Sequence, residues 1–74
     1  MTPSAHISKA GTAYCITVML DGQMIECTVY EFIPLRVAKA RASQRVRKLT
    51  YRILGEWQTS TDNNGNSIWV SQAI

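Results

Sequence analysis

The sequence contains few of the residues that build metal centres or disulfide frameworks, since its 74 residues include one histidine and two cysteines. A zinc site needs four ligands at a recognisable spacing, and His6 has no second histidine near it. The acidic residues are dispersed, no Ser or Cys adjoins a candidate base, and no glycine-rich loop is present to cradle a phosphate. We therefore expect a protein that is not an enzyme and that holds no metal and no cofactor.

Long apolar segments are also missing, although 46% of the residues are hydrophobic. A membrane-spanning helix needs roughly 20 consecutive apolar residues, and residues 1–11 lack the charged start and apolar centre of a signal peptide. The composition is that of a globular, cytoplasmic protein, and we expect one domain over residues 1–74. Because termini fray unless they are tied down, residues 1–10 are expected to form a flexible arm, in preference to a short edge strand at His6 to Lys9.

Two β-strands joined by a tight turn are the clearest pattern in the first half of the chain. Residues 12–20 are rich in β-branched side chains and alternate between two faces, which predicts a half-buried strand. Asp21-Gly22 is typical of a type I′ hairpin turn, so residues 23–30 are expected to return as the partner strand. This turn predicts the pairs Leu20 with Gln23, Val18 with Ile25, Ile16 with Cys27, and Tyr14 with Val29.

The predicted register determines where the two cysteines point. Cys27 faces the core as a small buried hydrophobe, and Cys15 faces the opposite side of the sheet. Side chains on opposite faces cannot reach disulfide geometry. We therefore expect both thiols to be reduced and unbridged.

Residues 34–48, with the sequence PLRVAKARASQRVRK, form the one convincing helix. Pro34 suits the first helical position, because its missing N–H is not needed there. The central alanines of the apolar face would let the helix lie close against a sheet. At about 100° per residue, that face consists of Leu35, Ala38, Ala42, Val46 and Leu49.

Positive charge is concentrated on this helix. Residues 36–52 contain seven basic groups and no acidic group, within a net charge of +3 for the chain. Such a patch attracts nucleic acid or an acidic protein surface; alternatively, the long basic side chains only cover apolar surface and keep their charges in water. The candidate partner-binding residues are Arg36, Lys39 and Arg47 on one flank, Arg41, Arg45 and Lys48 on the other, and Arg52 beyond the helix.

The remaining sequence predicts two further strands. Residues 49–59 are rich in β-forming side chains, residues 60–67 form a turn around Asn64-Gly65, and residues 67–71 form the last strand. The order is ββαββ, which predicts an α+β fold: an antiparallel sheet of four or five strands with one helix packed on one face. The other face is expected to be partly open, with Met19, Met24, Tyr30 and one or both tryptophans on it, although each tryptophan singly is better placed in the core.

Short motifs in the second half of the chain resemble a known family. Leu35, Ala38, Lys39, Ala42 and Ser43 form the pattern L-x-x-A-K-x-x-A-S. Arg52-Ile53, Gly55-x-Trp57, Gly65 and Trp69-Val70 follow in order. This succession resembles the small phage-encoded anti-CRISPR proteins, specifically the type I-F inhibitors numbered nine. The resemblance covers residues 35–70, and Ala40 stands where that family places an arginine.

The resemblance implies a function in a bacterial host. A protein of this family binds Cas protein subunits of a type I surveillance complex and prevents target DNA from pairing with the guide. Lys39 is the one basic helix residue that the resemblance carries over; the other candidate residues follow from the charge pattern. The alternative is a small basic nucleic-acid-binding protein of phage or plasmid origin, and non-specific contact with DNA is also compatible with the inhibitor. A monomer is favoured over an oligomer.

Overall fold

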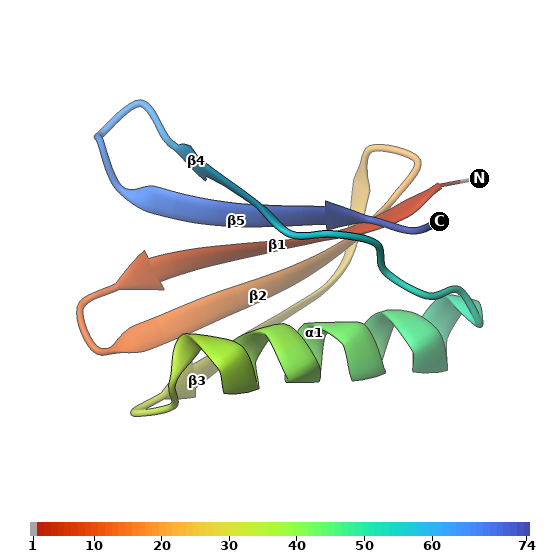
Figure 1. The fold of residues 1–74 in the computed structure, drawn as a ribbon, viewed down its shortest axis with the longest axis horizontal. Coiled ribbons are helices and arrows are strands. Elements are labelled where there is room, and N and C mark those ends of the chain that lie inside the picture. Colours follow the sequence, from red (N-terminus) through yellow and green to blue (C-terminus); the bar gives the residue numbers. More distant parts are fainter. Residues whose placement is uncertain (1) are drawn as a thin grey trace.

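The computed structural model describes residues 2–74. In this part of the chain, five strands form one antiparallel sheet, and one helix lies across one of its faces (Figure 1). The predicted α+β class is confirmed, although three strands instead of two precede the helix. The elements are β1 (Pro3–Ala10), β2 (Ala13–Leu20), β3 (Gln23–Glu31), α1 (Leu35–Thr50), β4 (Gln58–Thr61) and β5 (Ser67–Gln72).

Strand β1 lies at the centre of the sheet, whose order is β3-β2-β1-β5-β4. The prediction of a flexible arm is therefore wrong for the described residues 2–10. The alternative of a short edge strand at His6 to Lys9 is also wrong, because β1 is the central strand. Alternate side chains in the first five residues of β1, namely Pro3, Ala5 and Ile7, are fully buried, whereas Lys9 is exposed. Two of these three are small, so the apolar signal in the sequence is weak. The same small size lets α1 approach the middle of the sheet closely.

The hairpin between β2 and β3 has the predicted turn but not the predicted register. Asp21 and Gly22 both have positive φ angles, 53° and 80°, as a type I′ turn requires. Leu20 pairs with Gln23 as expected, but a bulge at Ile25 then shifts the partners by one residue. Beyond the bulge, the observed pairs are Val18 with Glu26, Thr17 with Cys27, Ile16 with Thr28, and Tyr14 with Tyr30.

The position of β3 in the sheet explains this difference. The apolar pairing assumed that α1 covers both strands of the hairpin, whereas α1 packs on β1 and β2, and β3 is an edge strand. Glu26 and Tyr30 therefore lie on the helix side of β3, where polar groups can reach α1, and the more apolar Val29 is exposed on the other face. Tyr30 is not on the open face, contrary to the prediction.

Helix α1 buries the face that the sequence predicts. Ala38, Ala42 and Val46 have no solvent-exposed surface and pack with Ala5, Ile7, Ile16 and Val18 of the sheet. The helix begins at Leu35, one residue later than predicted, with Pro34 as its N-cap. It continues two residues beyond Lys48 to Thr50, and Leu49 at this end is 41% exposed.

The strand predicted for residues 49–59 is largely absent from the described structure. Residues 49 and 50 belong to α1, residues 52–57 are irregular apart from a bridge between Leu54 and Ala73, and β4 covers only Gln58–Thr61. Trp57 and Trp69 both pack against the core, and the Trp69 ring meets the edge of Tyr14 with 5.9 Å between centroids. The core position favoured for each tryptophan is therefore confirmed.

Candidate interaction surface on the helix

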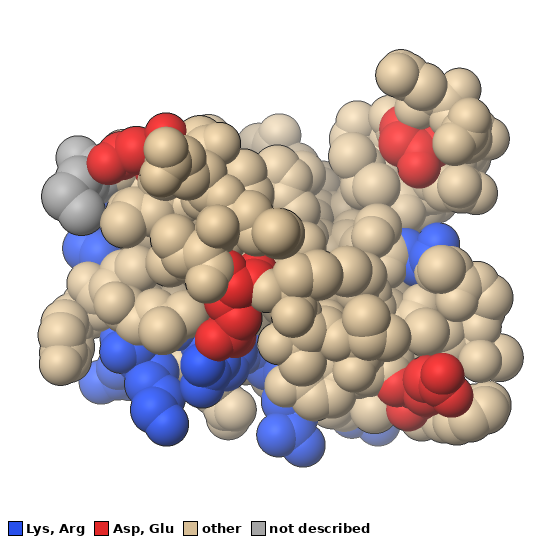
Figure 2. All heavy atoms as spheres, turned by 180° about the vertical axis from the view of Figure 1, so that it is seen from behind, with Lys and Arg blue, Asp and Glu red and all other residues tan. Residues whose placement is uncertain are grey.

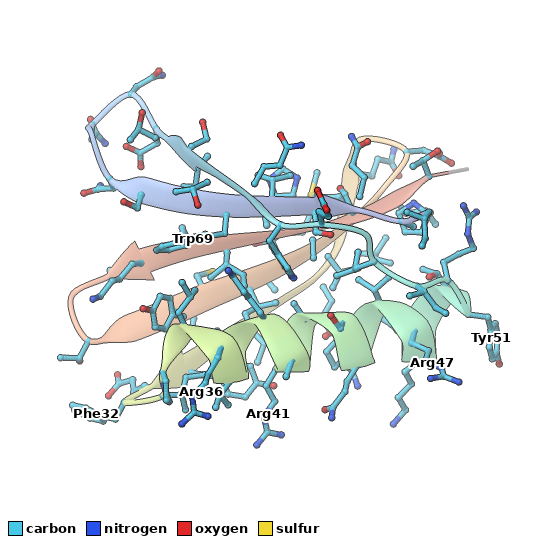
Figure 3. All side chains as sticks on the ribbon, viewed as in Figure 1. Phe32, Arg36, Arg41, Arg47, Tyr51 and Trp69 are labelled. Carbon is cyan, nitrogen blue, oxygen red and sulfur yellow. The ribbon has the colours of Figure 1, made fainter. Side chains whose placement is uncertain are left out.

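The face of α1 that points away from the sheet carries four of the eight basic residues of the protein. Arg36, Arg41, Arg47 and Lys48 are all exposed, and we call these four residues the basic ridge. Their side chains come from one rigid helix of 16 residues, which spans about 24 Å at 1.5 Å per residue. Lys and Arg side chains gather along the edge of the molecule formed by α1 (Figure 2), and Arg36, Arg41 and Arg47 point outward from it (Figure 3).

The N-terminal half of the ridge contains a shallow depression. Arg36 and Arg41 border it, together with Gln44, and the short side chains of Val37 and Ala40 form its floor. Two of the lining side chains, those of Arg36 and Arg41, are basic. Each guanidinium can donate hydrogen bonds to a carboxylate or phosphate group.

Arg45 forms an ion pair within the protein, whereas the charge pattern predicted it to be a partner-binding residue. Its guanidinium donates two hydrogen bonds to the carboxylate of Glu26 on β3, from Nε to Oε1 at 2.6 Å and from Nη2 to Oε2. These hydrogen bonds, with the nearby charges of Arg45 and Lys48, lower the pKa of Glu26 below its usual value of 4.5. This ion pair connects the helix to the edge strand β3.

The other predicted residues occupy three different surroundings. The Arg41 guanidinium lies over the Tyr30 ring, 5.6 Å from its centroid. Lys39 is half-buried on the flank of α1 away from Arg45. Arg52 lies beyond the helix, where its Nη2 donates to the Ile74 carbonyl at 3.3 Å. The structure thus brings the four ridge residues together and separates Arg52 from them.

Two exposed aromatic side chains stand at the ends of the helix and were missed in the sequence. Phe32 precedes α1 and is 78% exposed, and Tyr51 follows it and is 89% exposed. Both point away from the body of the protein (Figure 3). Both also have left-handed backbone angles, with φ of 59° and 60°, which costs a bulky residue on the order of 1 kcal/mol. A glycine or asparagine would fit these positions with less strain, so the aromatic side chains are not explained by folding.

No three His, Cys, Asp or Glu side chains of residues 2–74 come together to hold a metal ion. Helix α1 is not long and apolar enough to cross a membrane. What the helix surface offers is a rigid row of cations with an aromatic ring at each end. That arrangement can bind a large anionic partner.

No protein-family model, curated protein or solved structure matches the chain.

Proposed function

We propose that the protein is an anti-CRISPR inhibitor that binds Cas subunits of a type I surveillance complex and prevents target DNA from pairing with the guide. It acts by binding alone, in the cytoplasm of a bacterial host, without catalysis. The basic ridge, framed by Phe32 and Tyr51, is the proposed contact surface. The observation that carries the proposal is this combination of exposed cations on one rigid helix and exposed, strained aromatic residues beyond its two ends.

The composition of the surface favours a protein partner. Arginine and aromatic residues are enriched in protein–protein interfaces and supply most of their hot spots. Phe32 and Tyr51 would each bury a large apolar area, while the ridge pairs with carboxylates of the partner. The partner surface is accordingly expected to be acidic, because α1 residues 36–50 include no acidic side chain.

Some of the residues that carry the family resemblance lie in the core or pack against it. Ala38 and Ala42 are fully buried, and Leu35, Trp57 and Trp69 pack against them. Lys39 is half-buried beside the ridge, and Arg52, Ile53 and Gly65 are exposed. The resemblance therefore supports a shared helix–sheet packing, and the choice of a Cas partner rests on it, whereas the binding surface rests on the geometry of this chain.

A nucleic-acid-binding protein is the second candidate, and the ridge itself favours it. Its four exposed cations are the usual electrostatic footprint for phosphate contact. Exposed aromatic rings also stack on unpaired bases. In this case binding to naked DNA would weaken steeply with salt, with a slope of about −0.9 for each phosphate neutralised in a log–log plot for duplex DNA.

The test compares charge variants in two binding assays. The double variants Arg36→Gln/Arg47→Gln and Arg41→Gln/Lys48→Gln each lower the net charge by two. Lys9→Glu, on β1, lowers it by the same amount and is the matched control. Binding is measured by pull-down and biolayer interferometry against purified type I complexes, and by a gel shift with duplex DNA over a salt series. Arg45 is left unchanged because it supports the fold.

The inhibitor proposal predicts that at least one double variant loses 10-fold or more in affinity for a complex, on the order of 1.4 kcal/mol, while Lys9→Glu binds as wild type. The same variant should also restore target-DNA binding by the complex. Equal losses in all three variants would indicate a general charge effect. If the wild type binds no type I complex but shifts duplex DNA, the nucleic-acid reading replaces the inhibitor.

A further inference from the structure

The two cysteines lie together on the face of the sheet opposite the helix, contrary to the sequence-based prediction. Cys15 is on β2 and Cys27 on β3, and the bulge at Ile25 turns Cys27 to the same side as Cys15. The two Sγ atoms are 3.1 Å apart. Both side chains are reachable, because Cys27 is exposed and Cys15 is partly exposed. The geometric argument against a bridge is therefore wrong.

The surroundings of the pair are uncharged. Thr17, beside Cys15 on β2, points its Oγ1 to the Cys27 sulfur at 3.8 Å. Cys15 pairs with Ser8 on β1 and with Val29 on β3. A hydrogen bond between the thiols, helped by partial burial, raises the pKa of Cys15. Cys27 is the more exposed of the two thiols and is therefore the more accessible nucleophile.

The edge position of β3 allows the pair to close. A disulfide needs a sulfur–sulfur distance of about 2.05 Å, roughly 1 Å less than in the structure. Cys27 is diagonal to Cys15 in the register, because Cys15 pairs with Val29, so β3 must shift slightly toward β2. Strand β3 has a neighbour on one side only and is already bent at the bulge, so this shift does not disturb a second strand.

We propose that Cys15 and Cys27 form a thiol–disulfide exchange site that takes a low-molecular-weight disulfide, such as glutathione disulfide, as its oxidant. The Cys27 thiolate attacks one sulfur of glutathione disulfide, forms a mixed disulfide and releases one glutathione. The Cys15 thiolate then attacks the Cys27 sulfur and releases the second glutathione. The protein loses two electrons and two protons, and the oxidant becomes two thiols. The product is a cross-strand bridge between β2 and β3.

The experiment titrates the reduced full-length protein with glutathione disulfide and quenches it with acid. Denatured samples are alkylated with and without a reductant and weighed by mass spectrometry. Cys15→Ser and Cys27→Ser are run in parallel. Phenylarsine oxide, which is held by two adjacent thiols, is a second probe of the reduced protein and needs no strand movement. Circular dichroism shows whether each variant is folded.

The proposal predicts an oxidised product that carries no alkyl label and no glutathione, and that gains two labels after reduction. Cys15→Ser should stop at the mixed disulfide, and Cys27→Ser should react more slowly with glutathione disulfide. Wild type alone should bind one phenylarsine oxide. If the wild type accumulates only the glutathione adduct, the pair does not exchange, and the proposal is overturned even when the arsenical binds. If neither probe reacts with both thiols, the sulfurs are not adjacent.

Discussion

Replacement of Ala42 by Asp tests the helix–sheet contact on which the fold depends. Ala42 has no exposed surface and packs among Ile16, Val18 and other core side chains. A carboxylate placed there has no cationic partner in the core, and an unpaired buried charge costs about 3–5 kcal/mol. A domain of this length is stabilised by about 4–11 kcal/mol, at roughly 0.05–0.15 kcal/mol per residue. The substitution should therefore remove a large part of the stability or all of it.

Ala40→Asp is the matched control, because Ala40 lies on the exposed side of the same helix. Both substitutions carry the same helix-propensity cost of up to about 0.7 kcal/mol, so their difference isolates burial. Urea unfolding is followed by the fluorescence of Trp57 and Trp69, which pack against the core. With a slope of about 1 kcal/mol per molar urea, the midpoint of Ala42→Asp should lie about 3 M or more below that of Ala40→Asp. Equal midpoints would show that α1 does not pack on the sheet through Ala42.

Two further predictions concern the ion pair and the helix end. Arg45 holds the pKa of Glu26 below 4.5 in the folded protein. The stability that this ion pair contributes is therefore fully present above the pKa of Glu26 in the unfolded chain, and it is lost as the pH falls through the pKa of the folded protein. Glu26→Gln should flatten the fall in the free energy of unfolding below pH 4.5 in urea titrations. Asp62, whose pKa is also lowered, mainly by a backbone hydrogen bond from Asn66, should leave a residual slope, and an unchanged profile in Glu26→Gln would mean that the pair does not form in solution. Tyr51→Gly should raise the free energy of unfolding by up to about 1 kcal/mol, because glycine adopts the left-handed conformation without strain, and it should weaken binding to the partner. A variant that is less stable, or that binds as wild type, would contradict the role assigned to this ring.

Local sequence predicted the features that depend on neighbouring residues alone. Asp21-Gly22 specifies its turn because few dipeptides accept two positive φ angles. The spacing of Ala38, Ala42 and Val46 specifies the buried face of α1, because three or four residues complete one helical turn. The basic character of the helix surface is likewise evident in residues 36–48. The α+β class follows from these elements.

The sheet order and its consequences were decided by tertiary packing. A central β1 of small residues has little hydrophobic signal of its own and is buried because α1 lies over it. That placement makes β3 an edge strand, and the bulge at Ile25 then turns Glu26 toward the helix and Cys27 toward Cys15. The pairing of Arg45 and the proximity of the two thiols both depend on this one-residue shift. The sequence determined the turn between β2 and β3 and the buried face of α1. Only the arrangement of the strands around β1 decided which side chains meet, because the face of an edge strand is set by its neighbours and not by its own alternation.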